Sequence, residues 1–302
     1  MRVAVTGATG LIGRRLVQVL RTRGDEVIVL SRRPSSAGQL GATRVVQWDP
    51  VSSPAPGLSG VDGIVHLAGE PVAQRWSAAA KERIRSSRVT GTANLVAGLS
   101  AAEPRPRTLV STSAAGYYGD RGERLLDETA SPGPTEDFLT AVCLEWERAA
   151  SAAGELGLRV AIVRNGVVLD RRGGALAKML PPFKAGVGGP IAGGRQYMPW
   201  IALDDVVGIY TAALDGSEPW SGPVNACAPT PATNAEFARA LGHAVHRPAV
   251  IPVPAFGLRA LFGEMASVLT ASQRMVPAQA LGRGYEFRFA GLAEALQAAL
   301  RS

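Results

Sequence analysis

The sequence predicts an α/β protein built on a doubly wound parallel sheet, with a smaller, partly helical second lobe. Two observations predict it: short runs rich in Val, Ile and Leu alternate with helical patterns, and the first run leads through a glycine-rich turn into a helix. With 302 residues, of which 46% are hydrophobic and 19% charged, the chain can bury a large core. Because the carboxyl ends of parallel strands meet at one edge, we expect ligands to bind in the crevice outside that edge.

The first half of the chain supplies most of the expected sheet. Six apolar runs are predicted as strands: residues 2–6, 26–31, 44–48, 62–67, 107–113 and 158–164. Helical patterns at 11–23, 77–99 and 136–153 lie between them. The last helix follows a Pro-Gly-Pro stretch and has acidic residues near its start, which suit the positive end of the helix dipole.

The second half is richer in turns. From residue 166, glycine and proline pairs punctuate a loop-rich stretch that we assign to a substrate lobe. The elements expected next are a helix at 203–214, a strand at 224–226, a helix at 234–246 capped near Thr233, and a Pro-interrupted helical tail from 247 to 302. The resulting division is a larger domain over residues 1–228, with a substrate-lobe insertion at about 166–204, and a C-terminal domain over 229–302 that completes the substrate lobe.

The loop at residues 6–13, Thr-Gly-Ala-Thr-Gly-Leu-Ile-Gly, has the spacing of a dinucleotide-binding turn. Its glycines allow a tight turn, a close approach to a pyrophosphate, and packing of the next helix against the strand. The pyrophosphate would then meet the free N–H groups of that helix. We expect cofactor contacts from Gly7, Thr9, Gly10, Leu11, Ile12 and Gly13. The alternative is an ordinary structural turn, although the loop has the strand before it and the helix after it that the motif requires.

The end of the second strand distinguishes NADP(H) from NAD(H). A site selective for NAD(H) places an acidic residue about 20 residues beyond the glycines, where it holds the ribose 2′-hydroxyl. This chain has Ser31, Arg32 and Arg33 there, while Asp25 and Glu26 lie at the other end of the strand. Two guanidinium groups beside a hydroxyl can bind a 2′-phosphate through charge-assisted hydrogen bonds. The sequence therefore favours NADP(H), with a solvated basic loop as the alternative.

Charge and cysteine content limit the partners and the compartment. The net charge is +7 and the pI near 10, but the basic residues are scattered, so no nucleic-acid partner is expected. We also expect no membrane partner, because charges and prolines interrupt the longer apolar stretches and no secretory signal is visible. The two cysteines and three histidines lack metal-ligand spacing, which predicts no metal site and fits a reducing, cytoplasmic compartment. The expected partner is an unidentified small substrate, and an oligomer is compatible with the sequence.

Further motifs point to a family. They are His66-Leu67-Ala68-Gly69-Glu70-Pro71, Gly91-Thr92, Ser111-Thr112-Ser113, Gly116 to Asp120, Lys178 to Phe183, Gly193 to Gln196, and Asp204-Asp205. With them the chain resembles the extended short-chain dehydrogenase/reductases of the sugar-nucleotide epimerase type. More narrowly, it is similar to the atypical branch labelled "epimerase family protein", which has a C-terminal domain of unknown function. The resemblance covers nearly the whole chain and implies a Rossmann fold with a bound dinucleotide.

The resemblance also implies further cofactor contacts. They fall on Asp49, Leu67, Ala68, Gly69, Arg88 and Asn165. Asp49 matches a position that often meets the adenine, with loop capping as the alternative. Asn165 matches a position that contacts the nicotinamide end, with a tight polar turn as the alternative. Arg88 stands where the family commonly has Asn.

The usual catalytic pair of the family is missing from this chain. Typical members place a Tyr four residues before a Lys on the helix after the fifth strand, so that both lie on one helix face. The Tyr exchanges a proton with the substrate, and the Lys ammonium lowers the pKa of that Tyr and holds the ribose. Alignment of the helix on Glu147 puts Leu139 at the Tyr position and Cys143 at the Lys position, and of the usual set only Ser113 remains. A buried Cys usually behaves as a small hydrophobe, so Cys143 is not expected to be a nucleophile.

Three other residues are candidates for acid–base chemistry beside Ser113. Tyr117 and Tyr118 follow it closely and carry phenol hydroxyls, with packing in the core or pocket wall as the alternative. Glu70 lies just past the fourth strand and is a candidate general base. The alternative for Glu70 is a helix cap or an ion pair with Arg75 or Arg88.

Residues of the substrate lobe complete the expected site. By position these are Arg195, Gln196 and Trp200. An Arg there could hold an anionic group of the substrate, with a solvated loop residue as the alternative.

Two functions follow from these observations. The first is an NADP(H)-binding atypical short-chain reductase or epimerase that acts on an unidentified small substrate, such as a sugar or nucleotide derivative. The second is a catalytically silent NADP(H)-binding or sensing module, which the loss of the Tyr and Lys positions favours.

Overall fold

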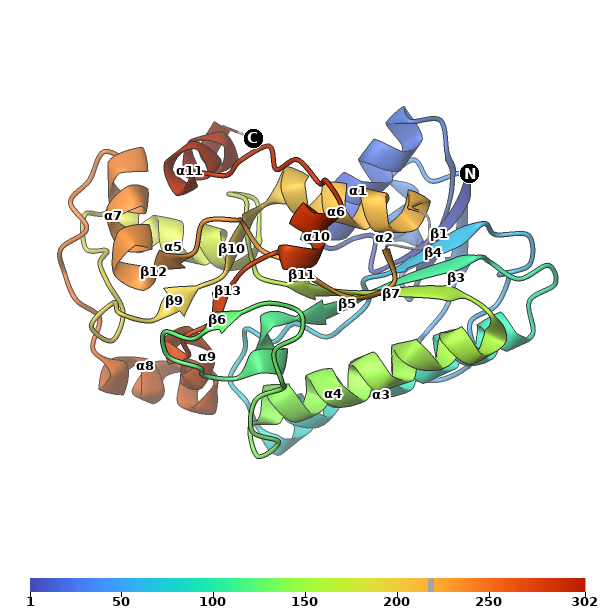
Figure 1. Ribbon diagram of the computed structural model, residues 1–302, viewed down its shortest axis with the longest axis horizontal. Helices are drawn as coiled ribbons and strands as arrows, with labels where there is room; N and C mark the ends of the chain where they lie inside the picture. Colours follow the sequence, from blue (N-terminus) through green and yellow to red (C-terminus); the bar gives the residue numbers. More distant parts are fainter. Residues whose placement is uncertain (217–219, 302) are drawn as a thin grey trace.

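The computed structural model describes residues 1–216 and 220–301, and its centre is a parallel sheet of seven strands (Figure 1). The strands are β1 (Arg2–Thr6), β2 (Glu26–Ser31), β3 (Arg44–Gln47), β4 (Gly63–His66), β5 (Thr108–Ala114), β7 (Arg159–Asn165) and β11 (Gly222–Ala226). Their order is β11-β7-β5-β4-β1-β2-β3, so the direction of winding reverses between β1 and β4. In an open α/β sheet, the crevice at such a reversal is where ligands bind. The six strands predicted from the sequence, and the later strand near 224–226, are confirmed.

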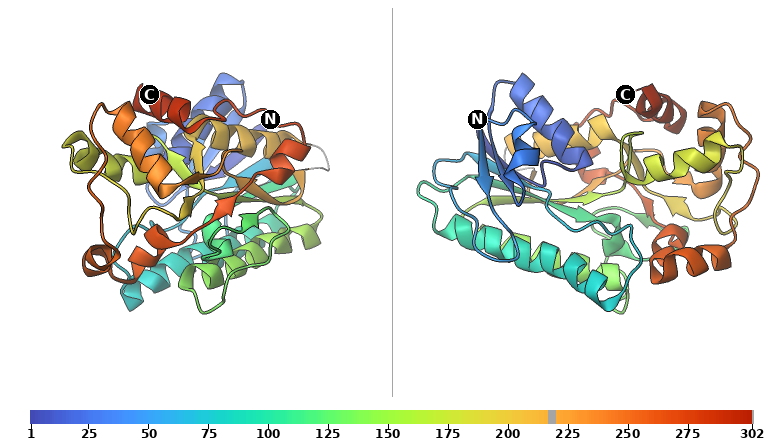
Figure 2. Two further views of the ribbon diagram at one scale, coloured as in Figure 1. Left: turned by 60° about the vertical axis from the view of Figure 1, so that its left-hand side comes forward. Right: turned by 180° about the vertical axis from the view of Figure 1, so that it is seen from behind.

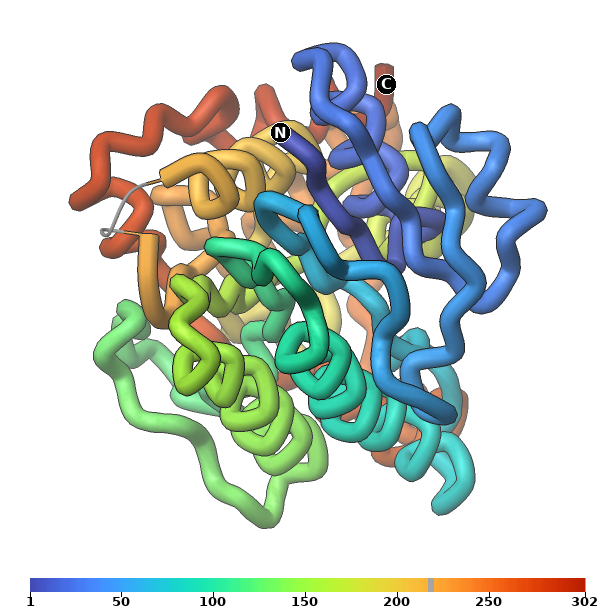
Figure 3. The backbone as a smooth tube through the Cα atoms, turned by 90° about the vertical axis from the view of Figure 1, so that its right-hand side faces the viewer, coloured from blue at the N-terminus to red at the C-terminus, as the bar shows by residue number. Residues whose placement is uncertain are grey.

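Two layers of helices cover the sheet (Figure 1, Figure 3). One face carries α1 (Leu11–Thr22) and α6 (Leu203–Asp215), and the other carries α3 (Ala78–Ser100) and α4 (Phe138–Ser151). Alternate strand residues serve the two layers: Val3 and Val5 pack on the side of α1 and α6, whereas Ala4 packs on the side of α3. Shorter elements of this domain are α2 (Pro34–Gly38), η1 (Ala115–Tyr118), β6 (Leu125–Leu126) and η2 (Ala152–Leu156).

The second lobe has its own core at one end of the molecule (Figure 2). It contains α5 (Gly174–Lys184), α7 (Asn234–Ala244) and α11 (Leu292–Arg301), with β8 (Val167–Leu169) paired to β10 (Trp200–Ala202) and β9 (Tyr197–Met198) paired to β12 (Ala232–Thr233). Thr233 caps α7 in a reciprocal capping box with Glu236, close to the predicted helix start. The predicted tail forms α8 (Ala255–Phe262), η4 (Gly263–Met265), α9 (Ala266–Thr270), β13 (Arg274–Met275) and α10 (Ala278–Gly282), while its last residue, 302, lies outside the described part.

Two buried carboxylates fasten the C-terminal segment to the central domain. Asp205 of α6 accepts hydrogen bonds from the backbone N–H groups of Arg288 (2.7 Å) and Phe289 (3.1 Å). Glu128 accepts one from the backbone N–H of Gln279 at 3.2 Å. Burial raises the pKa of both carboxyl groups. The tail is therefore held by polar contacts that are shielded from water.

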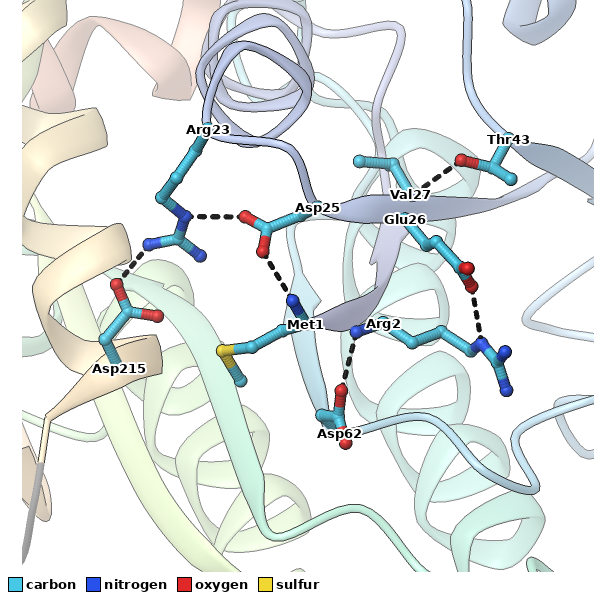
Figure 4. A network of polar contacts seen from close by, with 9 residues as sticks. All are labelled: Met1, Arg2, Arg23, Asp25, Glu26, Val27, Thr43, Asp62 and Asp215. Carbon is cyan, nitrogen blue, oxygen red and sulfur yellow. Dashed lines mark hydrogen bonds and ion pairs between the residues drawn. The ribbon is translucent and has the colours of Figure 1, made fainter.

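Ion pairs join the elements at the amino ends of the strands (Figure 4). Asp25 accepts hydrogen bonds from the Met1 ammonium (2.8 Å) and from Arg23 Nε (2.6 Å), and Arg23 also pairs with Asp215 of α6. A hollow of about 900 Å³ opens here, with Met1 and Asp215 in its wall. Because it lies at the edge of the sheet opposite the glycine-rich turn, it is distinct from the expected ligand crevice.

Candidate functional site

The glycine-rich turn between β1 and α1 leaves no room for side chains. Gly7 has a φ of +66°, and a Cβ there would lie 2.6 Å from the carbonyl carbon of Leu67. A Cβ on Gly13 would lie 2.4 Å from the Gly7 carbonyl oxygen, whereas one on Gly10 would meet that oxygen at 3.3 Å. Gly10 is the N-cap of α1 and makes no side-chain cap, so the first N–H groups of the helix are available to an anion.

A groove of about 480 Å³ runs past this turn. Its wall consists of Gly7, Gly10, Leu11, Ile12, Gly13, Leu67, Pro71, Arg88, Thr112, Val167, Val168, Gly174 and Ala175. Seven of these are predicted cofactor residues, which the structure brings together from the turn, the end of β4 and α3. Sequence reasoning missed Pro71, Thr112 and the contribution of β8 and α5. The Gly173-Gly174 pair was the available signal for α5, because Leu11 packs against both glycines.

A buried hydrogen-bond chain supports the floor of the turn. Thr6 Oγ1 accepts hydrogen bonds from the N–H groups of Leu67 (3.1 Å) and Ala68 (3.2 Å), which leaves its proton for His66 Nδ1 at 2.8 Å. His66 therefore carries its own proton on Nε2 and donates it to Thr92 Oγ1 at 3.0 Å. Burial lowers the pKa of His66 to about 4, so the ring is neutral at physiological pH.

The predicted 2′-phosphate residues lie at the end of β2, next to the turn. β1 and β2 are paired in register from Arg2 with Glu26 to Thr6 with Leu30. Ser31 Oγ accepts the backbone N–H of Arg33 at 3.1 Å, while the side chains of Arg32 and Arg33 are exposed. This loop thus presents two cations beside the glycine turn.

Two further predicted residues at this end have structural contacts. Asp49 lies in an exposed loop after β3, where its carboxylate accepts hydrogen bonds from the N–H of Val51 (3.2 Å) and the hydroxyl of Ser52 (3.1 Å). These hydrogen bonds within the loop agree with the alternative in which Asp49 caps the loop. Thr9 is half-buried in the turn, and its carbonyl accepts a hydrogen bond from Arg14 Nε at 2.9 Å.

Arg88 projects from α3 into the groove. Its Nη1 donates to the carbonyl oxygens of Glu70 (2.9 Å) and Ile84 (3.1 Å), and its guanidinium lies 5.0 Å from the centre of the Trp146 ring. Gly69 lies directly above it, since a Cβ there would come within 3.2 Å of Arg88 Cζ. Burial lowers the pKa of this guanidinium, although an Arg remains charged in proteins.

The helix face that carries the catalytic pair in typical relatives is apolar here. Leu139 and Cys143 of α4 face η1, because a Cβ on Gly116 would lie 3.2 Å from Leu139 Cβ and 3.6 Å from Cys143 Sγ. Cys143 is 3% exposed, and burial raises its pKa to about 12. At neutral pH it is a protonated thiol, which agrees with its expected role as a small hydrophobe.

A buried ion pair takes up the space next to this face. Arg164 of β7 binds both carboxylate oxygens of Glu147, with Nε–Oε1 and Nη2–Oε2 distances of 2.9 Å each. Ser113 donates its hydroxyl proton to the same Oε1 at 2.6 Å. The Ser113 hydroxyl is therefore bound to the carboxylate, and the residue is only 2% exposed. An accessible catalytic hydroxyl would be neither. Sequence reasoning missed Arg164, although a charge inside an apolar strand signals a paired or functional residue.

The two adjacent tyrosines have different surroundings. Tyr118 is fully buried: its hydroxyl accepts a hydrogen bond from Arg164 Nη1 (2.9 Å) and lies 2.7 Å from Asn225 Oδ1. Burial raises the pKa of Tyr118 to about 12. Tyr117 is half-buried, and its ring stacks under the Arg164 guanidinium, 3.4 Å from Cζ to the ring centre. Within the described part of the chain, the Tyr117 hydroxyl has no hydrogen-bond partner.

Glu70 precedes Pro71, which lines the groove. Its Oε1 accepts a hydrogen bond from Gln74 Nε2 at 3.3 Å and lies 3.7 Å from Arg83 Nε. The alternative that pairs its carboxylate with Arg75 or Arg88 is therefore wrong, because Arg83 is the partner and Arg88 binds the main-chain oxygen.

Asn165, at the end of β7, has an incomplete set of hydrogen bonds. Its Nδ2 donates to Thr112 Oγ1 (2.7 Å) and Tyr210 Oη (2.9 Å). Its Oδ1 is buried and has no partner among residues 1–216 and 220–301. Thr112, which accepts the hydrogen bond from Nδ2, lines the groove. A buried acceptor without a donor costs about 1–3 kcal/mol, which a ligand N–H could recover.

The three predicted substrate residues differ in their exposure and in their contacts. Trp200 is 1% exposed and packs in the core of the second lobe, so its ring has no accessible face for a substrate. Gln196 donates from Nε2 to the carbonyl oxygen of Ile191 at 3.0 Å. Arg195 is exposed. Of the three, only Arg195 is exposed, whereas the indole N–H of Trp200 is buried with no partner among the described residues.

Neither a membrane-spanning helix nor a metal-ligand cluster occurs among the described residues. Within that part of the chain, no helix is long and apolar enough to cross a membrane. The same residues contain no group of three or more His, Cys, Asp or Glu side chains arranged to hold a metal ion.

Comparisons with known proteins agree with the glycine turn and the sheet order. The human epimerase family protein SDR39U1 is 40% identical over 301 residues, which cover 98% of this chain and 99% of the relative. The chloroplastic SDR39U1 homolog of Arabidopsis thaliana is 40% identical over 306 residues, which cover 100% of this chain and 87% of the relative. The crystal structure of human SDR39U1 (isoform 2) with NADPH matches with a TM-score of 0.90 and 37% identity, with full coverage of both chains.

A second solved structure is also similar. The nucleoside-diphosphate sugar epimerase from Corynebacterium glutamicum is 36% identical with a TM-score of 0.78, covering 99% of this chain and 58% of that one. Residues 253–299 match a family model described as a domain of unknown function, DUF1731. Residues 3–226 match the model of the NAD dependent epimerase/dehydratase family, to which this chain belongs.

Proposed function

We propose that this protein binds NADP(H) and acts as an atypical short-chain reductase or epimerase on a small substrate. The observation that carries the proposal is the pairing of a glycine turn too tight for side chains with two exposed arginines at the end of β2. A carboxylate there would repel a 2′-phosphate, whereas Arg32 and Arg33 attract it. The NADPH in the human SDR39U1 crystal structure supports the same choice of cofactor.

The residues present fit the dinucleotide along its length. Gly7 and Gly13 leave space for a pyrophosphate at the first turn of α1. Arg32 and Arg33 would hold the 2′-phosphate, and Asn165 Oδ1 lacks a donor that a carboxamide N–H would supply. When bound, the cofactor would supply hydride donation or acceptance. The apolar groove wall would exclude water from the reacting atoms, which strengthens the electrostatic interactions there.

In this proposal, the group that exchanges a proton with the substrate must be accessible to it. Of the four candidates, Ser113 and Tyr118 have hydroxyls committed to the buried network around Arg164. The Tyr117 hydroxyl has no hydrogen-bond partner among the described residues, and the Glu70 side chain, next to the groove-lining Pro71, is 23% exposed. We therefore assign the proton donor to Tyr117, with Glu70 as the candidate base.

The substrate and the compartment are further parts of the proposal. Arg195 is an exposed cation in the substrate lobe, which suits an anionic sugar or nucleotide derivative. The similarity to a nucleoside-diphosphate sugar epimerase supports that substrate class. Two buried, unpaired cysteines, Cys143 and Cys227, favour a reducing cytoplasm.

A catalytically silent NADP(H)-binding or sensing module is the second candidate. It is favoured by the apolar face of Leu139 and Cys143 and by the commitment of Ser113 to Glu147. Tight binding of NADPH without turnover over a panel of carbonyl compounds and sugar nucleotides would favour the silent module. NADPH oxidation with any member of the panel, lost in Tyr117→Phe, would favour the enzyme.

Cofactor choice is tested by titrating the purified protein with NADPH and NADH. The double variant Arg32→Ala/Arg33→Ala should weaken NADPH binding at least about tenfold and change NADH binding little, because only NADPH carries the 2′-phosphate. A matched control removes two other exposed arginines, Arg44→Ala/Arg105→Ala, near the opposite edge of the sheet. Equal losses of NADPH and NADH in the first variant would contradict the assignment.

A further inference from the structure

Among the described residues that line the groove, Arg88 is the only charged one. The rest of the wall is glycine, aliphatic side chains, one proline and one threonine, so the field along the groove beyond the α1 terminus is set by this guanidinium. Arg88 lies under Gly69, past the end of β4, while Arg32 and Arg33 lie past the end of β2. Arg88 is thus a groove-wall cation that is separate from the two arginines past β2, which do not line the groove.

Contacts hold the Arg88 guanidinium rigidly but leave donors free. Nη1 is fixed by the carbonyl oxygens of Glu70 and Ile84, and Trp146 lies 5.0 Å from the guanidinium carbon. In the part of the chain that the structure describes, Nε and Nη2 have no hydrogen-bond partner. A preorganised cation with free N–H groups binds an oxygen ligand with little loss of side-chain entropy.

Arg88 faces α4: its guanidinium carbon lies 5.0 Å from the ring centre of Trp146, and the buried Cys143 stands three residues earlier on the same face of that helix. Position 143 is the one that corresponds to the lysine of typical relatives, and position 88 corresponds to their asparagine. The chain thus has a neutral group on α4 where a cation is usual, and a cation on α3 where a neutral amide is usual. Both changes occur at one place in the fold.

We propose that the charge has been relocated: Arg88 supplies from α3 the cation that holds the nicotinamide half of bound NADP(H), in place of a lysine at position 143. This inference rests on the proposed binding of NADP(H). It assigns Arg88 a positioning role at the ribose and phosphate oxygens of that half. It also explains why an uncharged Cys143 is tolerated, because a second cation beside Arg88 would be repelled at short range in a buried site.

The test is a charge-relocation cycle with Arg88→Asn, Cys143→Lys and the double variant. The dissociation constants of NADPH and of 2′,5′-ADP are measured by titration calorimetry; 2′,5′-ADP lacks the nicotinamide half. Arg88→Asn should weaken NADPH about 10- to 100-fold, the effect of losing a charge-assisted hydrogen bond, and leave 2′,5′-ADP unchanged. The double variant should recover most of the lost NADPH affinity, whereas Cys143→Lys alone should not improve it.

Three outcomes would overturn the relocation, two of them in the affinity for NADPH alone. One is NADPH affinity in Arg88→Asn that equals the original protein, and the other is a double variant no better than Arg88→Asn. Equal losses of NADPH and 2′,5′-ADP would also count against it, because they would indicate damage to the whole groove. Thermal unfolding of each variant and an Arg88→Lys variant, which keeps the charge and should retain partial affinity, control for misfolding. Failure of the proposed function itself would appear differently, as absent NADPH binding in the unaltered protein.

Discussion

Arg164 and Glu147 form a two-pronged ion pair, with both N–O distances at 2.9 Å, beside the helix face where typical relatives carry their catalytic tyrosine and lysine. The pair joins β7 to α4 and also binds the hydroxyl of Ser113. Side-chain exposure is 4% for Arg164 and 11% for Glu147. Leu139 and Cys143 occupy the tyrosine and lysine positions themselves, and the polar contact beside them is a closed, structural one.

Glu147→Gln should destabilise the protein strongly. Removal of one partner leaves the Arg164 guanidinium buried without its counter-charge, which costs about 3–5 kcal/mol in comparable sites. The matched control is Glu145→Gln on the same helix, because Glu145 also binds an arginine with both oxygens, Arg85, but at an exposed site. That change should cost at most about 1 kcal/mol. Urea unfolding of both variants measures the difference, and similar losses would mean that burial of the Arg164 pair is unimportant.

His66 should make the protein less stable at mildly acidic pH. Its folded-state pKa is about 4, below the ordinary value of 6.5, so protons bind the unfolded chain preferentially as the pH falls below 6.5. The contribution of neutral His66 to the free energy of unfolding is fully present above pH 6.5 and is lost as the pH falls toward 4. Between pH 7.5 and pH 5 this amounts to about 2 kcal/mol of unfolding free energy.

The measurement compares the unaltered protein with His66→Gln by urea unfolding at both pH values. Gln does not titrate, and its amide can still donate and accept toward Thr92 and Thr6. The stability difference between pH 7.5 and pH 5 should therefore shrink in the variant. Glu128 and Asp205, whose pKa values are raised, are present in both proteins and cancel in the comparison. An unchanged pH dependence would show that His66 is not the titrating group.

The glycines of the turn should respond unequally to alanine. In an exposed helix, Gly→Ala stabilises by about 1 kcal/mol. Gly13→Ala should instead destabilise the protein, because the new Cβ would lie 2.4 Å from the Gly7 carbonyl oxygen. It should also weaken NADPH binding. Gly38→Ala in α2 is the control, since a Cβ there meets nothing within 4 Å. Melting temperatures and NADPH titrations give both readouts, and a Gly13→Ala protein as stable as the control would contradict the tight packing.

The fold and the cofactor turn could be predicted because both depend on local patterns. Runs such as Val27 to Leu30 are apolar throughout, and the glycines at 7, 10 and 13 lie close together in the sequence, directly after the first strand. The partner of Arg164 could not be predicted in this way, because it depends on how α4 sits against β7. Its position in the sequence predicts Trp200 in the substrate site, but the two- and three-residue strands of the second lobe turn it into that lobe's core. Such short pairings leave little periodicity for a sequence pattern to reveal.

Tyr117 and Tyr118 should differ in what their hydroxyls do: that of Tyr118 stabilises the fold, and that of Tyr117 takes part in turnover. Tyr118→Phe removes a hydroxyl that contacts Arg164 Nη1 and Asn225 Oδ1, so buried polar atoms lose their partner and stability should fall by about 1–3 kcal/mol. Tyr117→Phe should change stability by less than about 0.5 kcal/mol, because its hydroxyl has no partner within the described residues and the ring that stacks on Arg164 is kept. Its effect should appear in turnover instead, with NADPH affinity unchanged. Urea unfolding, NADPH titration and single-turnover NADPH oxidation together distinguish the two residues. Full activity in Tyr117→Phe would remove that residue from the mechanism and leave Glu70 as the accessible acid–base group.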